Sequence, residues 1–298
     1  MLMRRITIVG LFLAGASGVF AVGQTAKAPL TAREAMSRII AATGAVPPSD
    51  TVDTLKAGDP ETVVTGVATT FMDTYAVLEQ AVADGKNLII THEPTFYNHR
   101  DETTVLAGDA VQAQKLEYIR QHHLVVYRFH DTWHMRQPDG ILEGVMGEFG
   151  WKPYQSRVDP NLFTIPPITV AQLAASLRSK AGSRTIRIVG DAKMTVTKVG
   201  LLPGAAGLKE QVKMLESDDV QVLVAGESAE WEGVEYAQDA AAEGRHKALI
   251  LLGHEISEEA GMQYCADWLK GVLPGLPIEY IRAGEPFETP ESVSAAKF

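Results

Sequence analysis

The 298-residue sequence contains a single cysteine, Cys265. One cysteine cannot form a disulfide within the chain, and no Cys-x-x-Cys pair is present to bind zinc. Any metal site must therefore be built from histidine, aspartate and glutamate side chains. The Gly-x-Ser-x-Gly motif is also absent, so the sequence gives no support to a serine hydrolase.

Positive charge is scarce. Lysine and arginine total 27 against 37 for aspartate and glutamate, so the formal net charge is -10. An acidic chain is repelled by nucleic acids and by anionic membrane surfaces. We therefore expect no nucleic acid partner and a small-molecule substrate. A local metal can still hold phosphate groups, so the charge does not exclude a phosphorylated substrate.

Long apolar runs are confined to the N-terminus. Arg4 and Arg5 precede an apolar run over residues 6–20, which small residues follow. This pattern is typical of a secretory signal peptide, and we place it at residues 1–28. The alternative is an uncleaved membrane anchor, for which the run is short. We expect a periplasmic or secreted protein that makes no membrane contact once the signal is removed.

Segments typical of strands and helices alternate along the chain, which predicts an α/β protein with largely parallel sheets. A faint internal repeat leads from an acidic residue and glycine through an aliphatic strand to a His-Glu pair, at residues 92–93 and again at 254–255. The aperiodic stretch 151–167 contains prolines and is interpreted as a link. We predict a first half over residues 29–155 and a related second half over residues 156–290, with a shared cleft between them.

The most informative segment is the aliphatic run 88–91, which ends at His92, Glu93 and Pro94. A continuous aliphatic run suits a strand that is covered on both faces, as in a parallel sheet. Proline has no N–H for the ladder, so the strand must end at the His-Glu pair. The pair is therefore predicted at the carboxyl end of a strand, where open α/β sheets bind their ligands.

Two further strands also end in histidine, and each histidine has a second potential ligand nearby. A spacing of four residues places two side chains on one face of a helical turn. The set of nitrogen and oxygen donors suits zinc, manganese, iron, cobalt or nickel, and it exceeds what one tetrahedral ion uses. We therefore predict two divalent ions with a bridging water. The candidate ligands are His92, Glu93, His130, His134, His254 and Glu258.

Simpler roles remain open for these residues. A histidine at a strand end is often only hydrogen-bonded within the fold. Asp131 is a candidate ligand but is better suited to orienting His130. The segment 203–207 follows one strand and precedes a helix, so its glycines suit either a tight turn or an anion held on backbone N–H groups.

Taken in order, these motifs resemble those of the Ngg-interacting-factor-three-like family, whose members are often labelled GTP cyclohydrolase I type 2 homologues. The family pattern is a strand ending in Thr-His-His-Pro, a strand ending in His-Thr-Asn-Leu-Asp, a Gly-rich strand-turn, a Thr-Gly-Asp/Glu segment, and a late Gly-His followed by Ser/Thr-Glu. The matching segments span roughly residues 30–285 and are Thr91-His92-Glu93-Pro94, His130-Asp131-Thr132-Trp133-His134, 199–207, 224–227 and Gly253-His254-Glu255-Ile256-Ser257-Glu258.

The resemblance implies a dinuclear metal centre in a cleft between two α/β halves, often within a toroidal hexamer, so a homo-oligomer is expected. It implies the same ligands, with His130 at or near the metals. Glu93 stands where the family usually has a second histidine, and His134 where it usually has aspartate, so an imidazole and a carboxylate have changed places. Trp231 replaces a histidine and is expected to add an apolar wall to the site.

These observations lead to the hypothesis of an exported metal-dependent hydrolase. A metal-bound hydroxide would attack the substrate, with Glu93 or Glu258 bridging the ions or orienting the water. The family label suggests opening of the GTP ring, but no residues suited to reading guanine stand out. The alternatives are a non-catalytic metal-binding or scaffold protein and a binding subunit of a larger exported assembly.

Overall fold

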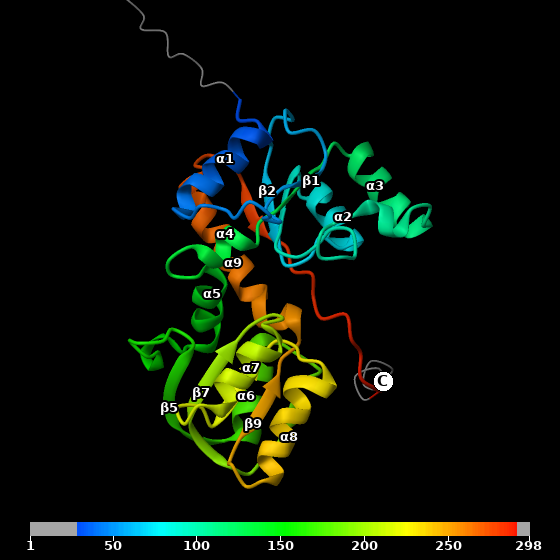
Figure 1. Ribbon diagram of the computed structural model, residues 1–298. Coiled ribbons are helices and arrows are strands. Elements are labelled where there is room, and N and C mark those ends of the chain that lie inside the picture. The colour runs from blue at the N-terminus through cyan, green and yellow to red at the C-terminus, as the bar shows by residue number, and fades with distance from the viewer. Residues whose placement is uncertain (1–28, 291–298) are drawn as a thin grey trace, which may run out of the picture.

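Two five-stranded sheets form the framework of residues 29–290, the part of the chain that the computed structural model describes (Figure 1). The predicted signal peptide lies outside the described residues. The predicted α/β class is confirmed, since most neighbouring strands are parallel. Within residues 29–290, no helix combines the length and the apolar character that crossing a bilayer requires.

The first sheet has the order β1-β4-β3-β2-β10, and only its edge strand β1 is antiparallel. Strands β2, β3 and β4 are buried along their whole length, as is typical of central strands in a sheet that is covered on both faces. The strands are β1 (Leu55–Ala57), β2 (Val67–Thr70), β3 (Leu88–Thr91), β4 (Val125–Arg128) and β10 (Ile278–Tyr280). The helices of this half are α1 (Ala32–Thr43), α2 (Tyr75–Ala83), η1 (Thr103–Leu106), α3 (Ala110–Gln121), α4 (Asp131–Met135), α5 (Gly140–Phe149) and η2 (Lys152–Tyr154).

The second sheet has the order β5-β7-β8-β9-β6, with a parallel centre and an antiparallel strand at each edge. Its strands are β5 (Leu162–Thr169), β6 (Arg187–Val189), β7 (Thr195–Leu202), β8 (Val222–Ala225) and β9 (Ala248–Leu251). Its helices are α6 (Val170–Ala181), α7 (Gly207–Glu216), the π-helix η3 (Glu230–Val234) and α8 (Glu235–Ala242). Helix α9 (His254–Val272) follows the last parallel strand.

The structure differs from the predicted division of the chain in two places. Strand β10, which the sequence assigned to the second half, pairs with β2 and completes the first sheet. Residues 162–169, which the sequence assigned mostly to a link, form strand β5. Its prolines are tolerated because β5 is an edge strand whose register shifts between Thr164 and Ile168.

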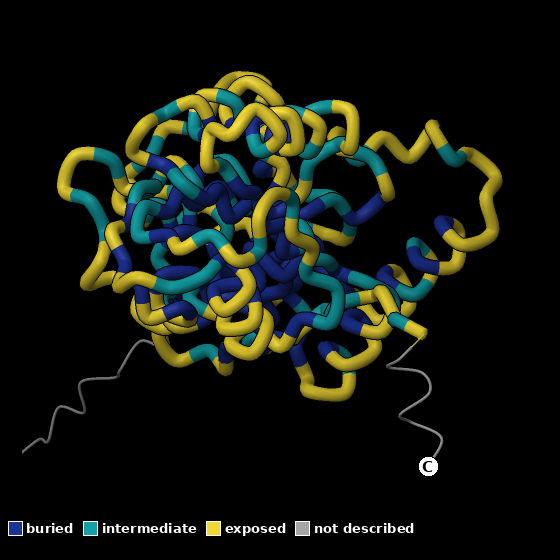
Figure 2. The backbone as a smooth tube through the Cα atoms, turned by 90° about the horizontal axis from the view of Figure 1, so that it is seen from below, coloured by how far each residue is buried: buried dark blue, intermediate teal, exposed yellow. Residues whose placement is uncertain are grey.

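Helices α5 and α9 connect the two halves in the middle of the molecule (Figure 1). Their backbones approach closely because glycines lie at the contact: a Cβ on Gly144 would lie 2.2 Å from the Ala260 carbonyl oxygen, and one on Gly261 would lie 2.5 Å from Ile141. One hydrophobic cluster runs from α1 through both helices into the second sheet. In Figure 2 the buried stretches of backbone lie together in the interior, beneath exposed segments. Because the hydrophobic cluster includes residues of both sheets, the halves share a core.

Candidate metal centre

The carboxyl end of β3 delivers His92 and Glu93. The backbone N–H of Glu93 donates to Phe71 O at 2.8 Å, and Pro94 then ends the strand. His92 is fully buried and Glu93 is 9% exposed. Two polar side chains with so little solvent contact require partners within the protein.

The carboxyl end of β4 delivers His130, and helix α4 places His134 one turn later. The carboxylate of Asp53 fixes this turn, because it accepts the backbone N–H groups of His130, Asp131 and Thr132 at 2.7, 2.8 and 2.8 Å. Asp53 precedes strand β1, which pairs with β4. The edge strand thus helps to determine where both histidines lie.

The carboxyl end of β9 delivers His254 and Glu258 on the first turn of α9. The turn that follows β7 packs directly against Glu258. A Cβ on Gly204, in this turn, would lie 2.3 Å from Glu258 Oε1. The N–H of Gly204 donates to Ser257 Oγ at 2.8 Å, and Ser257 Oγ donates to His254 O at 2.6 Å. The segment 203–207 is therefore a turn that supports Glu258, and Gly204 has no N–H free for an anion.

All six predicted ligands meet between the two halves. Glu258 lies at the centre, with its carboxylate oxygens 3.2 Å from His254 Nε2, 3.5 Å from His92 Nε2 and 3.9 Å from His134 Nε2. Glu93 Oε1 lies 3.4 Å from His254 Nε2 and 3.6 Å from His130 Nε2. The predicted convergence of strand ends is found, while the role of each residue as a ligand stays a prediction.

The four imidazoles have a common arrangement. In each, Nδ1 faces an oxygen outside the cluster: Phe129 O at 3.2 Å from His92, Asp131 at 2.9 Å from His130, Asp139 at 3.0 Å from His134, and Glu227 at 3.6 Å from His254. A carbonyl oxygen can only accept, so Nδ1 of His92 donates to Phe129 O, and Nε2 is the ring nitrogen that faces the cluster. Metal-ligating histidines are typically held in this way by oxygens that orient the ring.

Two atoms in the cluster have no hydrogen-bond partner although they are buried, His92 Nε2 and Glu258 Oε2. A buried ring nitrogen and a buried carboxylate oxygen that lack hydrogen bonds cost free energy, and a cation bound between them would offset that cost. Two groups of three have ligand atoms within 4.8 Å of one another, and both include His92: one adds His130 and His134, the other Glu93 and Glu258. The residues therefore fit a bound metal.

The charges of the cluster are strongly coupled in the metal-free protein. Burial alone would raise the pKa of Glu93, but hydrogen bonding to His254 and the charges of His92, His254 and His130 lower it to about 2. Burial opposes the charge on His254, yet its contacts with Glu227, Glu258 and Glu93 raise its pKa to about 12. Burial and the neighbouring imidazoles lower the pKa of His130 to about 4. The cluster thus keeps its carboxylates ionised for a cation.

Sequence reasoning missed several supporting residues. Arg128 is fully buried and places Nη2 3.1 Å from Glu93 Oε2 and Nε 3.0 Å from His92 O. Asp53 and Asp139 were not identified either. Arg128 ends the strand that precedes His130, so a charged residue inside an aliphatic strand was a usable signal; Asp53 lies 77 residues from its partner and gave none.

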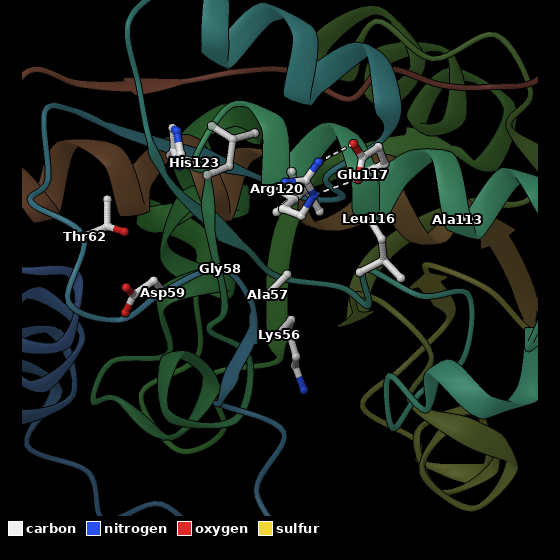
Figure 3. A pocket seen from close by; sticks show the side chains of 12 residues that line it. Lys56, Ala57, Gly58, Asp59, Thr62, Ala113, Leu116, Glu117, Arg120 and His123 are labelled. Atoms are coloured by element: carbon white, nitrogen blue, oxygen red, sulfur yellow. Dashed lines mark hydrogen bonds and ion pairs between the residues drawn. The ribbon is translucent and has the colours of Figure 1, made fainter.

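One expectation from the resemblance is wrong. Trp231 was expected to line the site, but it is 77% exposed on η3 and does not line the pocket beside the cluster. That pocket has a volume of about 560 Å³ and borders Glu93, Glu227 and His254. A second hollow, of about 630 Å³, lies between β1 and α3 and contains none of the six candidate ligands (Figure 3).

Comparison with known proteins agrees with this architecture. The fold is similar to Staphylococcus aureus protein SA1388 (TM-score 0.69, 17% identity, 88% of this chain and 99% of that one) and to a Bacillus cereus protein related to NIF3 (0.69, 12%, 88% and 100%). Reduced HcgD from Methanocaldococcus jannaschii is also similar (0.61, 14%, 86% and 98%). No curated protein matches the chain in sequence. The family model for Duf34/NIF3 (NGG1p interacting factor 3) matches residues 50–284, so the resemblance read from the motifs is confirmed and the chain belongs to this family.

Proposed function

We propose that this protein binds two divalent metal ions between its halves and hydrolyses a small molecule there. The observation that supports this most is the inward direction of four Nε2 atoms towards two ionised carboxylates. None of the six candidate ligands is a sulfur donor, so the set of donors suits zinc, manganese, iron, cobalt or nickel. When bound, two such ions lower the pKa of water and supply a nucleophile at neutral pH.

The protein's own residues would position and ionise this site. Glu258 is 3% exposed and lies among three imidazoles, so it is suited to bridging two ions. Glu93 has one oxygen towards His130 and His254 and the other on Arg128. The guanidinium fixes the carboxylate in one orientation. Glu93 is therefore suited to orient the attacking water.

The stoichiometry of metal in the purified protein tests the proposal. We expect about two ions per chain after reconstitution, measured by elemental mass spectrometry, and loss of at least one ion in His92→Ala and Glu258→Gln. His246→Ala removes an imidazole from the loop before β9 and serves as the matched control. A wild-type protein that retains no metal after dialysis contradicts the proposal.

Hydrolysis is tested separately on metal-loaded protein. A panel of phosphoesters, amides and cyclic nucleotides is assayed with wild type and with Glu93→Gln, which retains the shape of the side chain. We expect turnover that Glu93→Gln reduces by about 10²-fold or more. Full metal occupancy without turnover of any compound would favour the alternative role.

The alternative is a scaffold in which the ions hold the halves together. The ligands support it too, because four come from the first sheet's strand ends and two from α9. The two roles predict different results when a chelator removes the metal. A scaffold unfolds or separates its halves and shows no turnover, whereas an enzyme loses activity with the fold retained.

Export and assembly belong to the same proposal. The N-terminal sequence pattern supports cleavage near residue 28, which mass spectrometry of the secreted or periplasmic protein would measure. Family membership supports a homo-oligomer, with a hexamer as the expected form, and light scattering would give its mass. A monomer of uncleaved length would contradict both.

A further inference from the structure

Beside the metal cluster, a buried carboxylate lacks a partner. We propose that the pocket next to the cluster accepts an organic ammonium, a molecule with an apolar body and a protonated amine, and that Glu255 binds the amine. The inference rests on the proposed function in that the same molecule would present its reacting bond to the metal site.

Glu255 is the second residue of α9 and is only 6% exposed, yet neither of its oxygens has a hydrogen-bond partner. Its acidic neighbours differ in this respect. Glu259 accepts from Arg282 Nε at 2.7 Å and from Gly284 N at 3.0 Å, and Glu285 accepts from Thr185 N at 3.1 Å. Buried carboxylates without donors are costly, so Glu255 is suited to a donor supplied by a ligand.

The pocket that Glu255 lines is shaped for a small organic molecule. Its volume of about 560 Å³ lies within the range of ligand sites. Phe71, Tyr97, Ile256 and Phe287 supply apolar and aromatic surface. Aromatic rings also attract cations through their faces. Because His254 lines the same pocket, a molecule held at Glu255 lies beside the metal cluster.

The sign of the charge in this pocket favours a cation. Four carboxylates line it, Glu93, Glu227, Glu255 and Glu285, against one guanidinium, Arg187, and the imidazoles of His99 and His254. Arg187 is exposed to solvent, whereas Glu255 is buried. An anionic ligand would have to approach a buried carboxyl group, so this part of the pocket selects against it.

The wall that carries Phe287 comes from the C-terminal segment. After β10, residues 281–287 leave the first half and run beside the second (Figure 1). Arg184 holds this segment: its Nε lies 3.0 Å from Phe287 O, and its Nη2 lies 2.7 Å from Glu285 O. The aromatic side of the pocket is therefore fixed by hydrogen bonds to the second half.

The other hollow lacks this character. In Figure 3, Arg120 is joined to Glu117, and the closest atoms of the pair are 2.6 Å apart. Lys56 Nζ, also at this hollow, pairs with Asp101 at 3.1 Å. These charged groups already have partners, so the described residues that line this hollow include no unpartnered buried group comparable to the Glu255 carboxyl.

Binding of phenethylamine tests the inference. The probe carries a protonated amine and a phenyl ring, and phenethyl alcohol and hydrocinnamate are its neutral and anionic counterparts. Titration calorimetry on metal-loaded protein is expected to detect phenethylamine with Kd at or below about 1 mM and neither counterpart at that level. Glu255→Gln should weaken phenethylamine binding about tenfold or more, because a charge-assisted hydrogen bond is lost.

Glu216→Gln on α7 is the matched control, since it removes the same charge at an exposed site and should leave Kd unchanged. Thermal unfolding of each variant shows that the fold is retained. Equal affinity of wild type and Glu255→Gln, or no binding by wild type, overturns the inference. Loss of binding in Glu258→Gln but not in Glu255→Gln would mean that the amine binds the metal. Metal content and turnover are measured in separate experiments, so a failure of phenethylamine to bind would not contradict the proposed function.

Discussion

At the scale of single residues, the contact between Gly204 and Glu258 makes a sharp prediction. Gly204 has φ +66°, and a Cβ there would lie 2.3 Å from Glu258 Oε1. We expect Gly204→Ala to displace the carboxylate and to lower metal affinity about tenfold or more, the scale seen when a group that supports a ligand is changed. Elemental analysis after dialysis against defined free metal measures the effect.

Gly207 provides the control for backbone strain. Its φ of +79° is equally unfavourable to alanine, but a Cβ there meets nothing within 4 Å. Gly207→Ala should therefore lose some stability and retain its metal. Equal metal loss in both variants would assign the effect to the strained turn and not to Glu258.

The same scale shows what the sequence could reveal about the site. His92 and His130 follow neighbouring parallel strands of one sheet, whose carboxyl ends meet at one edge, so their proximity was predictable. His254 follows a strand of the other sheet, and only the internal repeat of the His-Glu pair indicated that it would face the same cleft. The groups that orient these histidines were not predictable, because Asp53 and Arg128 act through contacts between distant segments. The spacing of residues in the sequence identifies side chains that are neighbours on one helix or strand, but it does not identify contacts between distant segments.

Asp53 itself gives a test. Its carboxylate accepts three backbone N–H groups and the hydroxyl of Thr132. Asp53→Ala leaves these donors unpaired, so we expect unfolding free energy to fall by about 2–4 kcal/mol. Chemical denaturation measures it. Asp59→Ala removes the carboxylate that accepts the backbone N–H of Glu61, and it should cost less than about 1 kcal/mol. Equal losses in the two variants would contradict the argument.

At the scale of elements, the close packing of α5 on α9 is the feature to test. Gly144→Ala would place a methyl group 2.2 Å from the Ala260 carbonyl oxygen. The helices must separate, so we expect a loss of about 1–3 kcal/mol in unfolding free energy. Thermal and chemical unfolding measure it.

Gly147 lies on the same helix and has open space around its Cα. Gly147→Ala should therefore stabilise the protein by about 0.5–1 kcal/mol through the unfolded state. If Gly144→Ala lowers the unfolding free energy and Gly147→Ala raises it, contact with α9 decides the outcome. A change of the same sign in both variants would refute this explanation.

Element boundaries were predictable wherever local chemistry determined them. Side chains that begin helices accept N–H groups of the first turn, as Thr74 does for α2 and Asp109 does for α3. Strand β5 was missed because its prolines are typical of loops, and only its position at an edge makes them acceptable. The pairing of β10 with β2 depends on α9 returning the chain to the first half, which no local pattern reports.

At the scale of the whole molecule, metal binding and stability should be coupled. The candidate ligands come from both halves, so ions that bind only the folded chain stabilise it by mass action, by about 4 kcal/mol at a thousandfold excess over Kd. We expect chelation to lower the melting temperature by several degrees, measured by calorimetry with and without chelator. An unchanged melting temperature in protein shown to have lost its metal would contradict the coupling.

The dependence of this effect on pH has a definite sign. Contacts with Glu227, Glu258 and Glu93 raise the pKa of His254 from 6.5 to about 12 in the metal-free protein, despite burial. A raised folded pKa gives stability that is complete below about pH 6.5 and declines as pH rises towards the folded value. The metal-free protein should therefore lose stability between pH 7 and 9. Metal binding displaces that proton, so the loaded protein gains relative stability over the same range. The drop in melting temperature on chelation should be larger at pH 8.5 than at pH 6.5. The reverse order would show that metal binding does not displace the proton of His254.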